Sequence, residues 1–312
     1  MIPEVLENKI KASCGALFSD VLAGYRSARS VTLRANALKS SADEVAAKLR
    51  GAGIAFSRVA WYADAFILPD AREEEVEALP LYRNGEVYLQ SLSSMLPPLA
   101  LAPAAGENIL DMTAAPGGKT TQILALSGGK ALVTACERDA VRFERMKFNL
   151  ARQGAERVNA LRTDALALDD FLKFDKILLD APCTGTGTIS ADSRVRFSED
   201  YLAKCVKMQR KLLAKALRLL KKGGTLVYST CSVLREENDG AAEEAIRRGA
   251  KLVPLEFPEE LPRLPSMEGT VCVCPTSITR AFTSQNLQYK KRLKSRFFHN
   301  SKREICRPSF FR

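Results

Sequence analysis

The sequence predicts an α/β protein in which a Rossmann-like domain on a parallel sheet follows a small α+β domain. Three observations support this fold class. From about residue 109, short apolar segments alternate with segments of helical periodicity. One of the predicted strands leads through a glycine turn straight into a helix. Polar or reactive residues follow five of the strands, where the carboxyl ends of a parallel sheet would bring them together.

The composition fits one large domain or two ordinary ones, with 312 residues of which 46% are hydrophobic. No run of about 18 apolar residues occurs, so we expect no membrane span. The N-terminus lacks the apolar core of a signal peptide. Eight cysteines without a C-x-x-C motif suit a reducing cytosol better than a disulfide scaffold or a metal site. We therefore expect a cytoplasmic protein that acts as a monomer and binds no metal.

Residues 1–90 predict a small accessory domain of the α+β class. The predicted elements are helices in the first 30 residues, a strand at 31–34, a helix after the capping box at 41–44, two extended segments within 54–68, a helix at 73–79 and a strand at 87–89. Their order suggests a βαβ-like alternation. Such a domain either contacts RNA by shape and charge or serves only for packing, and the pattern leaves both open.

Residues 91–277 predict the main domain, which the chain enters through Pro97, Pro98 and Pro103. The predicted elements are strand 109–111, helix 117–126, strand 131–136, helix 139–153, strand 158–162, strand 175–180, helix 200–221, strand 224–230 and helix 235–248. This rhythm predicts a parallel sheet covered by helices on both faces.

The loop after the first of these strands reads Thr-Ala-Ala-Pro-Gly-Gly-Lys at 113–119. Its two glycines have no Cβ, so a ligand can lie against backbone N–H groups at the start of a helix. One interpretation is an ATP-binding Walker A loop, because the Gly-Gly-Lys-Thr end matches that motif. Thr113, however, stands in place of the first glycine of the motif, and Pro116 removes a backbone donor.

The favoured interpretation of this loop is a nucleoside site. A Rossmann-like site places an acidic residue after the second strand, where the carboxylate binds ribose hydroxyls. The strand at 131–136 is followed by Glu137, about twenty residues after the glycines. A Gly-Gly turn that binds nothing is the least favoured alternative.

Two cysteines lie in small-residue turns at the ends of predicted strands. Cys183 follows Asp180-Ala-Pro, and Cys231 follows Ser-Thr. A free cysteine is usually a small buried hydrophobe, but substrate can reach a thiol at the carboxyl end of a strand. From position alone, a functional and a structural role are equally open for both.

Several motifs in consistent order resemble the Nop/Sun family of RNA cytosine-5 methyltransferases. The matching pieces are RANALK at 34–39, YLQSLSSM at 88–95, DMTAAPGGKT at 111–120, DAPCTG at 180–185, YSTCS at 228–232 and EEN at 236–238. The resemblance covers residues from about 30 to 275. It implies a Rossmann-like class I methyltransferase domain with S-adenosylmethionine as methyl donor. It also implies a cytidine of RNA as acceptor, with rRNA ahead of tRNA.

The resemblance also implies roles for individual residues. C5 of cytosine is a poor nucleophile, so a thiolate first adds to C6 and makes C5 enamine-like. By resemblance Cys231 is that nucleophile, Cys183 is the base that assists release, and Asp180 hydrogen-bonds the cytosine ring. The implied cofactor residues are Thr113, Ala114, Ala115, Pro116, Gly117, Gly118, Lys119, Glu137 for the ribose, Asp164 for the adenine edge, and Asp180.

Residues 278–312 form a basic tail. The net charge of the chain is +11, yet 280–312 alone carry ten basic residues and one acid, and the remainder carries only +2. Family members tend to end their last strand with Glu-Gly-Phe-x-x-Ala-Lys, which is missing here. One permitted back-translation of 278–288, read in another frame, encodes Tyr-Glu-Gly-Phe-Tyr-Ile-Ala-Lys-Phe-Thr. We hypothesise a frameshifted end, and the competing interpretation is a genuine basic arm that binds phosphates.

The sequence thus predicts an RNA cytosine-5 methyltransferase. A first alternative is a catalytically inactive RNA-binding scaffold, which the two intact cysteine motifs disfavour. A second alternative is an ATP-binding protein that uses the Gly-Lys-Thr end of the glycine loop.

Overall fold

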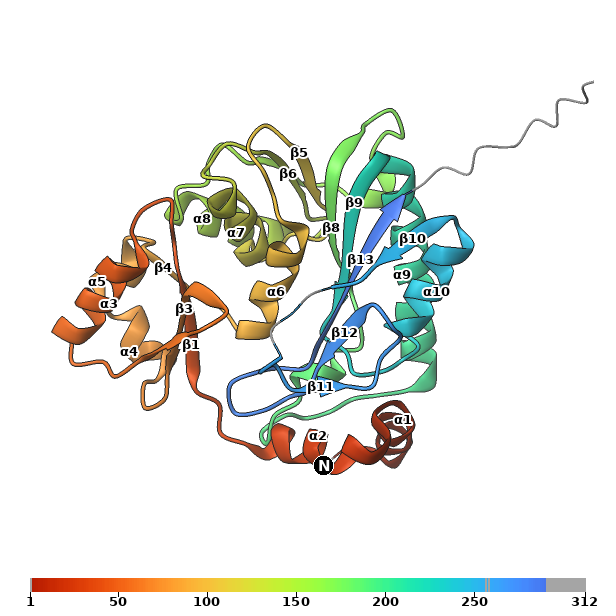
Figure 1. The fold of residues 1–312 in the computed structure, drawn as a ribbon, viewed down its shortest axis with the longest axis horizontal. Helices are drawn as coiled ribbons and strands as arrows, with labels where there is room; N and C mark the ends of the chain where they lie inside the picture. Colours follow the sequence, from red (N-terminus) through yellow and green to blue (C-terminus); the bar gives the residue numbers. More distant parts are fainter. Residues whose placement is uncertain (1, 256, 258, 290–312) are drawn as a thin grey trace, which may run out of the picture.

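The computed structural model describes residues 2–255, 257 and 259–289. Figure 1 shows a small domain with its own sheet beside a larger domain in which helices cover both faces of a long sheet. The two N-terminal helices, α1 (Glu4–Cys14) and α2 (Phe18–Arg26), lie along the lower end of the larger domain. Within the described residues, no helix combines the length and the apolar character needed to cross a membrane.

The two N-terminal helices belong to the core of the larger domain. Leu6 and Ile10 of α1 and Val21 of α2 are fully buried in one cluster with Val233 and Cys272. The hydrophobic periodicity of the first 30 residues therefore reflects packing against the large domain and not against the small sheet.

The small sheet is antiparallel throughout. Its strands are β1 (Val31–Ala35), β2 (Ser57–Val59), β3 (Tyr62–Leu68) and β4 (Val87–Leu89), in the order β2-β3-β1-β4. Its helices are α3 (Ala42–Gly51), α4 (Glu73–Glu77) and α5 (Pro80–Arg83). The predicted capping box is present, because the Ser41 side chain accepts from the Glu44 N–H and the Glu44 side chain accepts in return. The βαβ-like alternation is present in split form: β1 and β2, joined through α3, run parallel with β3 between them, although each directly paired couple of strands is antiparallel.

Helix α6 (Leu92–Leu101) connects the two domains and was not predicted. It contains Pro97 and Pro98, which in the sequence indicate a connecting segment. Proline disfavours a helix interior because it lacks the N–H donor. Here the buried apolar face of α6, with Leu92, Met95 and Leu96, holds the helix in place.

The large sheet confirms the predicted fold class. The strands β5 (Asn108–Asp111), β6 (Leu132–Cys136), β7 (Asn159–Leu161), β8 (Phe174–Asp180) and β9 (Leu220–Thr230) pair in parallel in the order β7-β6-β5-β8-β9. The helices α7 (Gly118–Leu126), α8 (Ala140–Arg152), α9 (Glu199–Leu219) and α10 (Asp239–Arg247) connect or cover them.

The sheet continues beyond β9 with strands that the sequence analysis did not predict in full. They are β10 (Ala250–Val253), β11 (Arg263–Leu264), β12 (Thr270–Val273) and β13 (Phe282–Tyr289). Strand β13 lies between β9 and β12 and is antiparallel to both. The first part of the predicted tail is therefore a central strand, and 290–312, with His299 and Cys306, lie outside the described residues.

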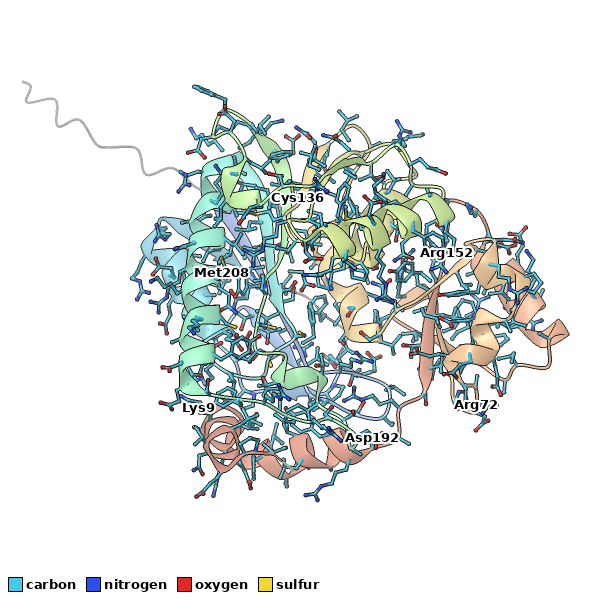
Figure 2. All side chains as sticks on the ribbon, turned by 180° about the vertical axis from the view of Figure 1, so that it is seen from behind. Lys9, Arg72, Cys136, Arg152, Asp192 and Met208 are labelled. Atoms are coloured by element: carbon cyan, nitrogen blue, oxygen red, sulfur yellow. The ribbon has the colours of Figure 1, made fainter. Side chains whose placement is uncertain are left out.

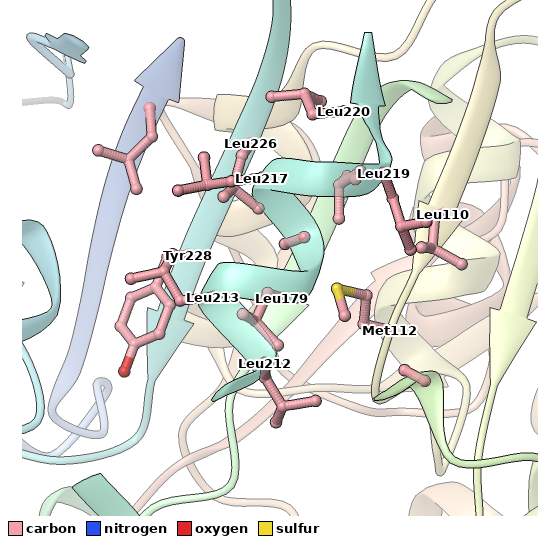
Figure 3. Close-up of a cluster of buried hydrophobic side chains, with 14 of the residues drawn as sticks. Leu110, Met112, Leu179, Leu212, Leu213, Leu217, Leu219, Leu220, Leu226 and Tyr228 are labelled. Atoms are coloured by element: carbon pink, nitrogen blue, oxygen red, sulfur yellow. The ribbon is translucent and has the colours of Figure 1, made fainter. Parts of the chain in front are cut away.

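The core lies on both faces of the parallel strands. Figure 3 shows the leucines of α9, among them Leu213 and Leu217, packed beside Leu179, Leu226 and Tyr228 of the sheet. A second cluster on the α7 and α8 side contains buried residues such as Ile109, Ile123, Val133, Met146 and Val227. These two layers hold the strands in register, so the loops at their carboxyl ends have fixed positions.

Candidate active site

The carboxyl ends of the parallel strands bring the predicted polar residues to one edge of the sheet. Asp111 ends β5, Asp180 ends β8 and pairs in register with Ser229, and Cys231 follows β9 directly. Glu137 follows β6. The alternation of strands and helices thus predicted the placement of this edge correctly.

The glycine loop is held by α8 and leads directly into α7. Gly117 has a φ of 101°, which favours glycine, and it caps the N-terminus of α7. A Cβ on Gly118 would lie 2.9 Å from the Tyr88 ring. Arg142 donates to the Ala115 carbonyl at 2.9 Å, and Asn149 donates to the carbonyl of Pro116 at 2.8 Å. These bonds fix the loop carbonyls on the α8 side.

Asp111 is a buried acid with spare hydrogen-bonding capacity. Its Oδ2 accepts from the Thr120 hydroxyl at 2.7 Å, whereas its Oδ1 is buried and has no partner among the described residues. Burial raises the pKa of Asp111 to about 6. An unpartnered buried carboxylate oxygen costs free energy unless a ligand donates to it.

The two outer acids, Glu137 and Asp164, are oriented by backbone donors at their strand ends. Glu137 is buried, accepts from the Asp139 N–H at 2.9 Å, and lies 3.5 Å from an Arg142 nitrogen. Asp164 accepts from the Leu166 N–H at 2.9 Å. Both carboxylates keep oxygens that could accept from hydroxyl or amino groups of a nucleoside.

Lys119 and Asp180 form an ion pair at the centre of the edge. Lys119 Nζ lies 2.6 Å from Asp180 Oδ2, and Ser229 donates to Asp180 Oδ1 at 2.9 Å. Thr113 donates to the Asp180 carbonyl at 2.8 Å, which links the glycine loop to β8. Burial disfavours the charged form of Lys119, but the attraction and hydrogen bond of Asp180 outweigh it and raise the pKa. Because Asp180 engages this ammonium, Lys119 is poorly disposed to bind phosphates as a Walker A lysine would.

The two predicted thiols meet although they come from different strands. Cys183 Sγ and Cys231 Sγ are 3.2 Å apart, and both side chains are partly buried. The hydrogen bond from Cys183 lowers the pKa of Cys231, and Lys119 acts in the same direction. That hydrogen bond, burial and the negative charges of Cys231 and Glu237 together raise the pKa of Cys183. These opposite shifts make Cys231 the more readily ionised thiol of the pair.

The other described cysteines lie apart from this pair and are buried. They are Cys14, Cys136, Cys205, Cys272 and Cys274. Burial raises the pKa of Cys14 and of Cys136 to about 12, so these two are inert thiols at neutral pH. In the described part of the chain, no group of three or more His, Cys, Asp or Glu side chains could hold a metal ion.

Sequence reasoning missed several residues that support the site. Ser229 orients Asp180, Arg142 and Asn149 hold the glycine loop, and Gln209 of α9 donates to the Pro182 carbonyl at 2.9 Å. Glu237 accepts from Thr184, the residue after Cys183. Glu237 could have been found from its place in the motif at 236–238, whereas nothing in the amphipathic pattern of α9 singles out Gln209.

A cavity of about 780 Å³ opens between the small domain and this edge. On the side of the large domain, its lining consists of the glycine loop and the ends of two strands. The residues are Asp111, Thr113, Ala114, Ala115, Pro116, Gly118, Lys119 and Asp180. Arg72 and Tyr82 line it from the small domain, and Arg152 lines it from α8. Figure 2 shows Arg152 where α8 meets the small domain, and its guanidinium lies 4.2 Å from the centre of the Tyr82 ring. Glu137, Asp164 and the two thiols lie outside this cavity lining.

A buried arginine joins the small domain to α7 of the large domain. Arg34 of β1 is fully buried and donates to Gln90 Oε1 at 3.1 Å and to Thr121 Oγ1 of α7 at 3.1 Å. Gln90 in turn donates to Gln122 at 3.0 Å. A buried polar network of this kind fixes the small sheet relative to the glycine loop.

Comparison with known proteins agrees with this geometry. Residues 98–285 match the family described as 16S rRNA methyltransferase RsmB/F, and 2–73 match the family described as the RsmF/B-like ferredoxin-like domain. A crystal structure described as a methyltransferase homolog from Pyrococcus horikoshii is 31% identical with a TM-score of 0.81, over 92% of this chain and 95% of that chain.

Curated relatives show the same similarity. The 28S rRNA (cytosine-C(5))-methyltransferase of Mus musculus is 37% identical over 243 residues, which are 74% of this chain and 30% of the relative. The Ribosomal RNA small subunit methyltransferase F of Shewanella sp. (strain ANA-3) is 36% identical over 218 residues, which are 68% of this chain and 45% of the relative. The chain spans less than half the length of either relative. It belongs to the RsmB/F family of rRNA methyltransferases, which confirms the predicted resemblance to the Nop/Sun group.

Proposed function

We propose that this chain transfers a methyl group from S-adenosylmethionine to C5 of a cytidine in RNA, with rRNA favoured over tRNA. The observation that carries the proposal is the thiol pair, with Cys183 and Cys231 3.2 Å apart beside the Lys119–Asp180 ion pair. The names of the rRNA cytosine-5 methyltransferases among its relatives support the same reaction.

The residues at the edge fit S-adenosylmethionine, which would supply the methyl group. The free oxygen of Asp111 is a buried acceptor beside the glycine loop. The loop from Thr113 to Lys119 would place its backbone against S-adenosylmethionine, because the residues between these two have no long side chains. They are Ala114, Ala115, Pro116, Gly117 and Gly118. Glu137 would accept from the ribose hydroxyls, and Asp164 would accept at the adenine edge. Asp180 would border the donor at the cavity.

The first chemical step belongs to Cys231. Its thiolate attacks C6 of the cytosine, the electron pair of the C5–C6 bond moves into the ring, and C5 becomes nucleophilic. The hydrogen bond from Cys183 and the charge of Lys119 favour the thiolate that this step requires. Asp180 would hydrogen-bond the amino side of the cytosine, and Lys119 beside it would stabilise the charge that builds on the ring.

The last step belongs to Cys183. When Cys231 sulfur is bonded to carbon, it carries no charge and no longer accepts a hydrogen bond. Two of the causes that raise the pKa of Cys183 are then gone, so this thiol can lose its proton to solvent. The Cys183 thiolate then takes the proton from C5, the C5–C6 double bond re-forms, and Cys231 leaves as a thiolate.

We further propose that the enzyme acts as a monomer in the cytosol with RNA as its partner. The lining of the cavity between the two domains includes five arginines that could contact RNA phosphates, beside the acids Glu73, Glu74 and Glu77. We also propose that the chain is divided near 90 and 277, as the sequence predicts. The packing of α1, α2 and β13 supports assigning these three elements to the large domain.

Trapping of RNA tests the proposal. Cys183→Ala, Cys183→Ala/Cys231→Ala and the control Cys14→Ala, which changes a buried thiol in α1, are each mixed with host RNA and S-adenosylmethionine. Protein–RNA adducts that survive a denaturing gel are then measured. We expect the single Cys183 variant to trap RNA, and the double variant and the control to trap none.

Three results would contradict the proposal. Cys183→Ala that binds S-adenosylmethionine and RNA but forms no adduct would show that the thiols have other roles. RNA binding without methyl transfer by the unchanged chain would favour the inactive scaffold. Binding of ATP in place of S-adenosylmethionine would favour the Walker A alternative.

A further inference from the structure

Glu237 is a buried carboxylate with an unusual set of partners. It is fully buried in the turn between β9 and α10, six residues after Cys231. Across the described ranges, no lysine or arginine forms an ion pair with it. Burying an acid in this way is costly unless hydrogen-bond donors surround it. Its own position is fixed, because the hydroxyl of Tyr228 donates to the Glu237 carbonyl at 2.8 Å.

The donors to this carboxylate hold the loop of Cys183. The N–H of Thr184 donates to Oε1 at 2.9 Å, and the Thr184 hydroxyl donates to Oε2 at 2.5 Å. Gln209 donates to Oε1 at 3.0 Å and also to the carbonyl of Pro182 at 2.9 Å. The residues before and after Cys183 are therefore both tied to one buried carboxylate, directly or through Gln209.

We propose that Glu237 is a positioning residue for the release step, and this inference rests on the proposed function. Its carboxylate fixes the Cys183 loop so that the sulfur of Cys183 stays 3.2 Å from Cys231. After methyl transfer, C5 lies next to the carbon that Cys231 holds, so a base at this place reaches the C5 proton. A loop that moves by about 1 Å would slow this proton transfer strongly.

The charge of Glu237 adds an effect that packing alone would not give. It raises the pKa of Cys183, after the larger effects of Cys231 and burial. A higher pKa keeps Cys183 protonated as the donor to Cys231 before attack, and it makes the later thiolate a stronger base. Removal of this charge lowers the pKa of Cys183, so the pH dependence of release moves to lower pH.

The experiment compares Glu237→Gln with Glu236→Gln, a neighbouring acid that is exposed and pairs with Lys9. Each variant is mixed with host RNA and S-adenosylmethionine, and the covalent adduct and the free methylated RNA are measured over a range of pH. We expect Glu237→Gln to form the adduct but to release it roughly tenfold to a hundredfold more slowly, with a pH profile displaced downward. Glu236→Gln should behave as the unchanged chain.

Thr184→Val provides a second variant, because it removes one hydroxyl donor and leaves the carboxylate in place. If Glu237→Gln does not fold, as judged by circular dichroism, a slower release by Thr184→Val supports the inference and normal release overturns it. Normal release and an unchanged pH profile in a folded Glu237→Gln also overturn it.

Cys183→Ala separates the two proposals. If it traps RNA while Glu237→Gln releases normally, only the role of Glu237 fails. If it traps none, the release mechanism itself fails.

Discussion

Strand β13 carries polar side chains into the middle of the large sheet, and this leads to a prediction about stability. Ser284 Oγ, Gln285 Oε1 and Asn286 Oδ1 are buried without a partner among the described residues. Ser284 is 1% exposed, and its neighbours on both sides are buried. A buried polar group without a partner costs about 1–3 kcal/mol, a large part of the 5–15 kcal/mol that stabilises a typical protein.

The substitution Ser284→Ala removes one of these unpartnered groups and little volume. We expect it to raise the free energy of unfolding by about 1–2 kcal/mol, because the cost of burying the hydroxyl disappears. The matched control is Thr283→Val on the same strand, whose hydroxyl donates to the Ser232 carbonyl at 3.4 Å. Loss of that bond should lower the free energy of unfolding by about 0.5–1.5 kcal/mol. Urea unfolding followed by circular dichroism measures both.

The two changes should thus have opposite signs. If Ser284→Ala destabilises the chain as Thr283→Val does, the hydroxyl has a partner and the reasoning about β13 is wrong. Unequal slopes of the urea dependence would instead show that the transitions are not comparable, and thermal unfolding would then decide the sign.

We propose that the same strand is read out of frame from about residue 278. The alternative frame replaces Ser284 by Ile, Gln285 by Ala and Asn286 by Lys, which removes all three unpartnered oxygens. It also replaces Arg280 by Glu. It also changes the surroundings of Arg29, whose pKa is lowered first by burial and then by the like charge of Arg280. Sequencing of the gene across these codons tests the proposal, and an uninterrupted frame would refute it in favour of a basic arm.

Three further predictions concern charge and sulfur chemistry. Arg280→Glu should replace the repulsion between Arg280 and Arg29 by attraction and raise the free energy of unfolding, measured in urea, by up to about 1 kcal/mol. If the substitution instead weakens RNA binding and leaves stability unchanged, the two arginines serve as a phosphate site. Hydrogen peroxide should oxidise Cys183 and Cys231 to a disulfide, with reduction of the peroxide to water and loss of methyl transfer. The intact mass of the protein and the recovery of activity with dithiothreitol check this. Two free thiols after loss of activity would contradict it. Lys119→Met removes the positive charge that lowers the pKa of Cys231, so adduct formation should require higher pH, and an unchanged pH profile would exclude this role.

Local patterns predicted those parts of the fold in which pattern and environment agree. The central strands β5 and β8 are short, mostly apolar runs with buried centres, and Asp111 and Asp180 mark their ends. Helix α6 was missed because two prolines lie in its interior, and burial of its apolar face overrides that local signal. Strand β13 was missed because its polar residues do not alternate as a strand would. The antiparallel pairing of the small sheet depends on contacts between distant residues, and the order of elements does not reveal them.

The site shows the same division between local signal and tertiary contact. Both cysteines could be singled out from the turns that hold them, but their distance depends on the pairing of β8 with β9, where Asp180 faces Ser229. Glu237 follows Cys231 in the chain, yet its carboxylate holds the loop of Cys183. The turn that carries Cys231 thus also fixes the loop of Cys183. A change in this turn should affect both ends of the reaction, and separate measurement of adduct formation and release would distinguish them.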